Sequence, residues 1–143
     1  MNEKKEIQGK LIRYQILDGR IKALLKRREL LIAKILEIET TLSTIEEIEK
    51  NKESEILLPF GSNVHVPGTL KDIKKMIVEL GANMAIEEDV EETKKILEKR
   101  KNIINDGLRI TENEITSLSN EMLKLESEIG ALIEKIKPEV TAD

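Results

Sequence analysis

A chain of 143 residues, of which 36% are charged and 1% aromatic, has too few large apolar side chains for a broad globular core, and its Glu, Lys, Leu and Ile content favours long helices. Its net charge of -4 is small and both signs are interspersed, which argues against nucleic acid or an anionic membrane as a partner. The absence of cysteine excludes disulfides and thiolate metal sites.

Residues 5–50 are predicted to form the first of two long coiled-coil helices. Apolar residues recur at heptad spacing between Ile7 and Ile45, and only Lys10 and Arg28 interrupt the pattern. A stripe of this length is typical of a helix that packs against another helix along one seam.

Residues 54–87 differ in composition and predict two β-hairpins. Residues 55–87 hold three of the seven glycines and two of the three prolines, set among short runs that favour strands. We predict strands near residues 55–59, 63–67, 74–80 and 83–87, with turns at residues 60–62, 67–68 and 81–82.

Residues 88–137 carry a second heptad stripe, which begins at Val90 and is interrupted at Lys94, Lys101 and Thr111. Pro138 is expected to end this helix and to leave 138–143 as a short tail. Acidic residues cluster at its start, where we interpret them as complementing the positive end of the helix dipole rather than forming an acid/base or cation site. These are Glu87, Glu88, Asp89, Glu91 and Glu92.

Together these elements predict a mainly α fold with a small β region, in which a long antiparallel α-helical coiled coil carries two β-hairpins at its base within a single domain, 1–143. Because the hairpins return the chain to its starting point, seam positions of the two helices must face each other. The register that satisfies this pairs Tyr14 with Leu125 and Ile35 with Ile104. It also places Arg28 opposite Thr111, so one pair of facing polar residues is expected to interrupt the apolar seam.

The hairpin region resembles that of alpha-type prefoldin subunits. The similarity lies in residues 58–68 (LPFGSNVHVPG), residues 75–81 (KMIVELG) and Ile86-Glu87-Glu88. It extends to nearly the whole chain, because the family has the same order of helix, hairpins and helix, and two hairpins distinguish its alpha class. The resemblance implies a hexamer of two alpha-type and four beta-type subunits. It further implies a chaperone that holds unfolded proteins at its coiled-coil tips without ATP and delivers them to a group II chaperonin.

The predicted hairpins are too small for a core of their own, and strands of this kind need partner strands. We therefore expect them to form the oligomerisation surface. The alternative is that they pack only on the helix bases of the same chain. The expected residues are Ile56, Leu57, Leu58, Val64, Val66, Ile77, Val78, Met84 and Ile86.

The other end of the predicted coiled coil is expected to bind client proteins. Leu11 and Ile12 cannot both face the seam together with Ile7, so this tip should expose apolar surface. Gly9 and Gly130 should also weaken the helices there. The alternative interpretation is that these residues only pack against each other at the tip and bind no client. The expected binding residues are Ile7, Leu11, Ile12, Tyr14, Ile129, Leu132, Ile133 and Ile136.

No sequence motif indicates an enzyme, a cofactor or a metal site. His65 is the only histidine, and it has no spaced partner ligand, so we expect it to face solvent on a strand. No long apolar run or signal peptide is evident, which favours a cytoplasmic location. A structural coiled-coil scaffold or filament protein that binds no clients is the alternative to the chaperone reading.

The predicted register can be tested by crosslinking. A variant with Tyr14→Cys and Leu125→Cys should form a disulfide readily within one chain, because seam partners bring their Cβ atoms close together. Mass spectrometry of the oxidised monomer reports the bond. A chain that stays reduced under conditions that oxidise other paired cysteines would contradict the register.

Overall fold

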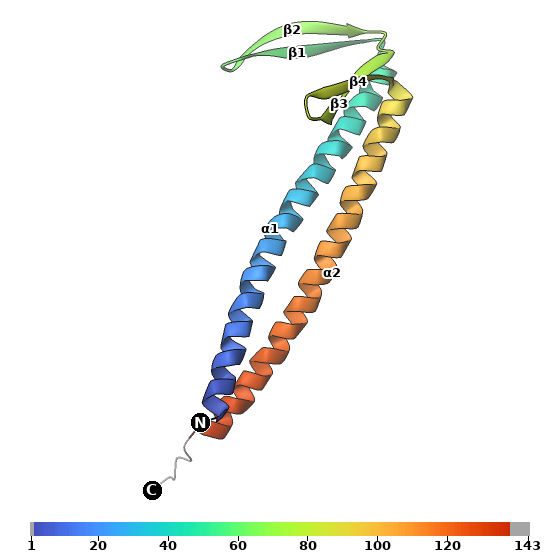
Figure 1. The fold of residues 1–143 in the computed structure, drawn as a ribbon. Coiled ribbons are helices and arrows are strands. Elements are labelled where there is room, and N and C mark those ends of the chain that lie inside the picture. Colours follow the sequence, from blue (N-terminus) through green and yellow to red (C-terminus); the bar gives the residue numbers. More distant parts are fainter. Residues whose placement is uncertain (1, 138–143) are drawn as a thin grey trace. The chain divides into compact units, whose positions relative to one another are not determined.

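The computed structural model describes residues 2–137 and divides the chain into two compact units. The order of elements is α1 (Asn2–Lys50), β1 (Glu53–Gly61), β2 (Val64–Lys71), β3 (Lys75–Gly81), β4 (Met84–Asp89) and α2 (Val90–Ile136), as Figure 1 shows. The predicted fold class is confirmed. Pro138 and the predicted tail, 138–143, lie outside the described residues.

The first unit contains residues 2–32 of α1 and residues 106–136 of α2, which lie side by side and run antiparallel (Figure 1). Its core is the predicted seam, because the buried apolar residues all belong to the two heptad stripes. They are Ile7, Leu17, Leu24, Leu125 and Ile129. The helices come close at Gly107, where an added Cβ would lie 4.0 Å from Leu31 Cδ1.

One polar residue is buried within this seam. Thr111 is 2% exposed, and its hydroxyl donates a hydrogen bond to the carbonyl of Gly107 one turn earlier, at 2.8 Å. Its polar group is therefore satisfied within α2. Arg28, which the sequence placed at the same level, is exposed instead, since its long side chain keeps the guanidinium in water. Of the predicted polar pair, Thr111 is therefore buried in the seam and Arg28 is not.

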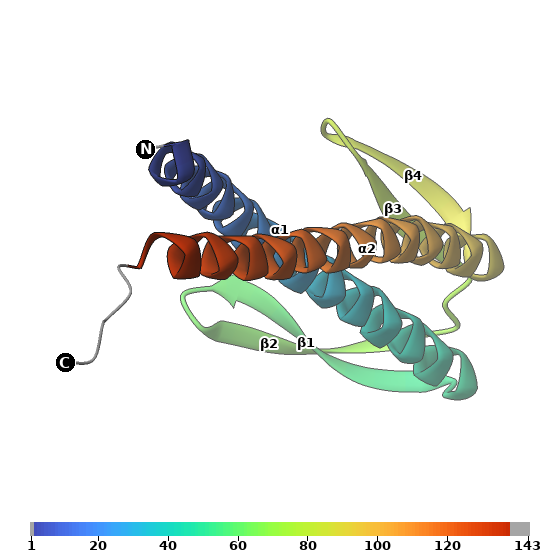
Figure 2. The same cartoon turned by 90° about the horizontal axis from the view of Figure 1, so that it is seen from below.

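The second unit, Ala33–Asn105, contains the remaining parts of both helices and the two hairpins. The strands form two separate antiparallel sheets of two strands, β1 with β2 and β3 with β4, which project in different directions from the helix ends (Figure 2). Both hairpins turn in the same way. Ser62 and Asn63 in one, and Ala82 and Asn83 in the other, adopt positive φ.

The predicted turn at Pro67-Gly68 is wrong. Both residues lie inside β2, where Pro67 is opposite Leu57 and Gly68 is opposite Ile56. A proline interrupts a strand ladder only where its missing N–H would point to the neighbouring strand. Pro67 is tolerated because it occupies a position where that N–H would point away from β1. Each first-hairpin strand consequently runs to residues that the sequence prediction left out, such as Glu53 and Lys71.

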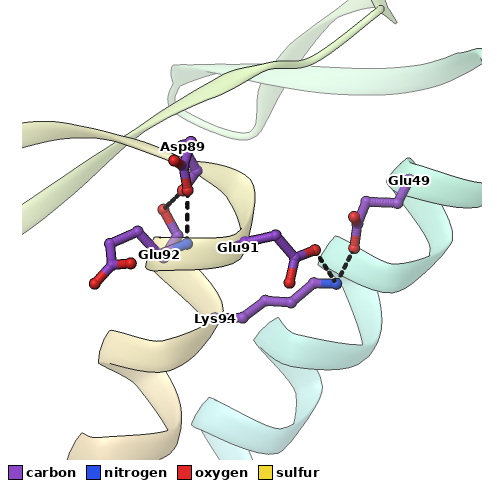
Figure 3. Close-up of polar contacts among 6 residues, drawn as sticks. Glu49, Asp89, Glu91, Glu92 and Lys94 are labelled. Carbon is purple, nitrogen blue, oxygen red and sulfur yellow. Dashed lines mark hydrogen bonds and ion pairs between the residues drawn. The ribbon is translucent and has the colours of Figure 1, made fainter.

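The start of α2 is capped by Asp89, whose Oδ1 accepts a hydrogen bond from the Glu92 N–H at 2.7 Å (Figure 3). Glu91 and Glu92 occupy the first turn, where negative charge is stabilised. This arrangement agrees with the predicted role of the acidic cluster. Lys94 pairs with Glu49 near the end of α1 and with Glu91 of its own helix. This ion pair ties the two helix ends together beside the hairpins.

Neither α1 nor α2, over the residues that the structure describes, contains a segment long and apolar enough to cross a membrane.

Two helix glycines offer a direct test of the local helix stability. Gly9 and Gly130 are exposed, and an added Cβ at either position meets nothing within 4 Å. Gly9→Ala and Gly130→Ala should each raise the free energy of unfolding by about 1 kcal/mol in urea titrations followed by circular dichroism. Gly61→Ala is the control. Gly61 has φ of +101°, a conformation that residues with a side chain rarely adopt, so this substitution should lower the free energy of unfolding. A loss of stability in either helix variant would contradict the structure.

Candidate functional site

The end of the first unit where the N-terminus lies exposes apolar side chains that the seam does not use. Leu11 is 45% exposed and Ile12 is 58% exposed on α1, while Ile133 is 41% exposed on α2. Ile136 is also exposed. These four residues are called the tip patch below. Their exposure agrees with the off-seam positions that the heptad pattern gives to Leu11, Ile12 and Ile133.

The other predicted tip residues form the seam beneath this patch. Ile7 and Ile129 are buried, and Tyr14 and Leu132 are half-buried. They therefore hold the two helices together, and among the predicted tip residues only those of the tip patch are exposed.

Polar contacts on the flanks of the seam fix the register of the helices in the first unit. Nζ of Lys10 lies 2.6 Å from Glu128 Oε2, and the Tyr14 hydroxyl donates to Glu126 Oε1 at 2.7 Å. The latter contact is next to Leu125, in agreement with the predicted pairing with Tyr14.

Two arginines one heptad apart repeat the same geometry. Arg13 and Arg20 each donate two hydrogen bonds to one carboxylate oxygen, that of Glu121 and Glu114 respectively. In these four cross-helix contacts of the first unit, α1 supplies the donor and α2 the acceptor. Sequence reasoning missed these contacts and treated Lys10 as a break in the stripe. The signal was the matching seven-residue spacing of the arginines and of their glutamates.

The closest of these pairs changes the ionisation of its members. The hydrogen bond from Lys10 lowers the pKa of Glu128, and the same bond raises the pKa of Lys10. The hydrogen bond to Glu126 raises the pKa of Tyr14, because a carboxylate acceptor favours the protonated phenol. The tip is therefore held partly by ionised groups, although its exposed patch is apolar.

The hairpins expose a second apolar surface, in the second unit. Ile77 is 72% exposed, and Leu57, Leu58, Val64 and Met84 are exposed as well. Ile56, Val66 and Ile86 are half-buried. Phe60, 71% exposed, and Leu80 also belong to this surface, although the sequence analysis did not include them. These residues, without Val78, are called the hairpin surface.

Val78 differs from the other predicted oligomerisation residues because it is buried within its own chain, at 6% exposure. It lines a groove together with Ile45 and Ile48 of α1 and Leu97 of α2. Arg100 of α2 also holds this hairpin, since its Nη2 donates to the Glu79 carbonyl at 2.8 Å. Val78 and Arg100 thus fix β3 on the helices, while Ile77 on the opposite face of the strand remains open.

The described residues offer no site for catalysis by a metal. His65 is exposed on β2, as expected, and residues 2–137 contain no group of three or more His, Cys, Asp or Glu residues placed to hold a metal ion. The acidic residues near β4 include the cap of α2, Asp89, and the ion-pair partner of Lys94, Glu91.

Comparison with known proteins identifies the family. The model of the prefoldin subunit family matches residues 17–135. The chain belongs to the prefoldin subunit family. Its similarity to prefoldin subunit alpha of Methanosarcina acetivorans is 30% identity over 131 residues, covering 89% of this chain and 92% of the relative. For prefoldin subunit alpha of Pyrococcus horikoshii the identity is 29% over 116 residues, which cover 80% of this chain and 78% of the relative.

These relatives confirm the resemblance to alpha-type prefoldin subunits. The fold has a solved counterpart in filamentous prefoldin from Methanocaldococcus jannaschii, determined by cryo-electron microscopy. The two share 23% sequence identity with a TM-score of 0.67, over 85% of this chain and 98% of that one. At this identity the likeness concerns the fold.

The Lys10–Glu128 pair should make the tip sensitive to pH. Because the pKa of Glu128 is lowered in the folded state, its ionised carboxylate stabilises the fold at pH values above 4.5. This stabilisation is lost as the pH falls through the pKa that Glu128 has in the folded chain. Because the pKa of Lys10 is raised in the folded state, its protonated amine stabilises the fold at pH values below 10.5. This stabilisation is lost as the pH rises through the pKa that Lys10 has in the folded chain. The pair therefore stabilises the tip between these limits.

Glu128→Gln should lower the melting temperature at pH 7, and the difference from the unmodified prefoldin chain should shrink as the pH falls below 4.5 and through the lowered pKa of Glu128. Thermal unfolding followed by circular dichroism measures this. The control is Glu112→Gln, which removes an exposed α2 glutamate that makes no ion pair within residues 2–137. A difference that persists undiminished at pH 3 would contradict the assignment.

Proposed function

We propose that this prefoldin-family chain is the alpha-type subunit of a hetero-hexameric chaperone with two alpha-type and four beta-type subunits. It acts in the cytoplasm, captures unfolded proteins at its tip patch without ATP and delivers them to a group II chaperonin. Residues 54–87 serve oligomerisation, and the helices of residues 5–50 and 88–137 carry the binding ends.

The observation that carries this proposal is the tip patch itself. Leu11, Ile12 and Ile133 stay exposed beside a complete seam, in a chain that has charged residues at 36% of its positions. Clustered apolar side chains at the end of two packed helices suit a partner that offers apolar segments of varied sequence, as an unfolded protein does.

Small patches bind weakly, because capturing a flexible client costs conformational entropy. Joining several subunits through their hairpins raises the effective concentration of tips around one client, so weak contacts add up to useful affinity. The exposed hairpin surface supports such joining, since isolated two-stranded hairpins are only marginally stable in water. Successive weak contacts also release a client without nucleotide hydrolysis.

A filament-forming scaffold is the second candidate function. It is favoured by one observation, the similarity in fold to a prefoldin that is described as filamentous. A scaffold needs the hairpin surface but has no use for the tip patch. The two candidates are therefore separated by changes at the tip.

The test replaces Leu11, Ile12 and Ile133 with Ser in one variant, assembled with a beta-type prefoldin from the same source. Suppression of aggregation of a chemically unfolded test protein, followed by light scattering, should fall by more than tenfold, because each serine removes roughly 1.5–3 kcal/mol of apolar contact and about 1.4 kcal/mol already corresponds to a factor of ten. The matched control replaces Leu30, Leu36 and Ile103, which are as exposed but lie away from the tip. It should retain full activity.

Equal activity of the tip variant and the unmodified assembly would favour the scaffold. A similar loss in the control variant would mean that clients bind along the helices rather than at their ends.

A further inference from the structure

The arginine–glutamate pairs that flank the seam of the first unit stop one heptad short of a third pair. Arg13 and Arg20, which both pair with glutamates of α2, are followed seven residues later by Arg27. On α2 the residue seven positions before Glu114, the partner of Arg20, is Gly107, which has no side chain to act as an acceptor. Within residues 2–137, Arg27 makes no hydrogen bond or ion pair. Its guanidinium is therefore free to pair with a carboxylate from outside the chain.

A groove lies between the two helices of this unit where Gly107 leaves space. Ala23, Leu24 and Arg27 of α1 line it together with Gly107 and Ile110 of α2. Its volume is about 260 Å³. Most small-molecule sites are larger, at roughly 300–1,000 Å³, and are more enclosed by apolar walls. The groove therefore suits one or two side chains from the surface of another protein better than it suits a small molecule.

Apolar side chains extend from this groove along α1. Ile16, Ala23 and Leu30 follow one another at intervals of seven residues, so they lie in a row on one face of the helix. Ile16 and Leu30 are more than half exposed, and so is Ile110 on the α2 side of the groove. At a rise of about 1.5 Å per residue the row is about 21 Å long, which is the length of about four helical turns. Its shape therefore suits a helix laid along the seam.

The charge beside this row determines which helix would fit. Arg13 and Arg20 are neutralised by glutamates of α2, whereas the charge of Arg27 is not balanced within the described residues. A symmetric contact with a second copy would bring the arginines of both rows close to one another, and like charges across an interface are unfavourable. A different helix with a carboxylate among its apolar side chains would supply the acceptor that Gly107 lacks. Apolar contacts around that pair would exclude water and strengthen it.

We propose that the groove at Gly107 and the row of Ile16, Ala23 and Leu30 bind an amphipathic helix of another protein, in which a Glu or Asp among the apolar residues pairs with Arg27. The partner helix lies along the seam as a third helix and covers Ile110. A contact of this size is small, so the interaction is weak and transient. It uses neither the tip patch nor the hairpin surface, and it does not depend on the proposed chaperone function.

The test supplies the missing carboxylate from the chain itself. Gly107→Glu should pair with Arg27 and occupy the groove. An added Cβ at position 107 would lie 4.0 Å from Leu31 Cδ1, an ordinary contact, and glycine weakens a helix. The variant should therefore melt at a higher temperature than the unmodified chain, which shows that any loss of binding is not caused by unfolding. Gly107→Ala is the matched control, because it gains helix stability in the same way and leaves Arg27 without a partner.

The probe is a fluorescent stapled helix that carries two Leu one heptad apart and one Glu between them, and its binding to the full chain is followed by fluorescence anisotropy. Gly107→Glu should weaken binding by about tenfold or more, the size expected for loss of one hydrogen bond between charged groups. Gly107→Ala should bind like the unmodified chain.

A charge exchange tests the role of Arg27 directly. Arg27→Glu should lose affinity for the Glu probe and gain it for a second probe that has Lys in place of Glu. Lys26→Glu is the control, because Lys26 is the exposed neighbour of Arg27 and does not line the groove. It should leave the binding of both probes little changed.

Three results would overturn the inference. The first is that the unmodified chain binds the Glu probe no better than the Lys probe, and the second is that Gly107→Glu or Lys26→Glu affects binding as Gly107→Ala or Arg27→Glu does, respectively. The third is a dimer of the chain alone in analytical ultracentrifugation that Gly107→Glu dissociates, since this would assign the groove to a second copy. The proposed chaperone function would stand in each case.

Discussion

The exclusion of water from the seam between α1 and α2 is the interaction on which the rest of the structure depends. Buried apolar residues in each unit are few, and the hairpins contribute only Val78 to them. With so little apolar surface elsewhere removed from water, most hydrophobic stabilisation comes from helix pairing. The hairpins consequently rely on the helices through Val78 and the Arg100 contact, and most of their remaining large apolar residues stay exposed.

The seam also explains how an apolar binding surface exists on a highly charged chain. A heptad pattern uses two positions in seven, so an apolar residue at any other position remains exposed. Leu11, Ile12 and Ile133 occupy such positions near the helix ends. The ion pairs of Lys10 and Arg13 with glutamates of α2 hold the helices in register at this end of the seam. The exposed apolar side chains are therefore not needed to fix the register. The contacts that hold the helices together are thus made by other side chains than those of the tip patch.

The helices and their register could be predicted from the sequence, because heptad spacing depends only on local geometry. The strand limits could not, since Pro67-Gly68 has the composition of a turn and only its cross-strand partners show otherwise. The sequence did contain a better signal, the repeated Gly-x-Asn of Gly61-Ser62-Asn63 and Gly81-Ala82-Asn83, where positive φ is needed. The distinction between buried Val78 and exposed Ile77 depends on which strand face meets the helices, and alternation alone does not decide that.

The central claim is that this prefoldin-family chain completes its hairpin surface with other subunits and presents its tip patch as part of an assembly. The most direct measurement is the native mass of the chain, alone and after mixing with a beta-type prefoldin from the same source. The account predicts a six-subunit species that contains two copies of this chain. A chain that ignores the beta-type subunit and forms filaments by itself would contradict it.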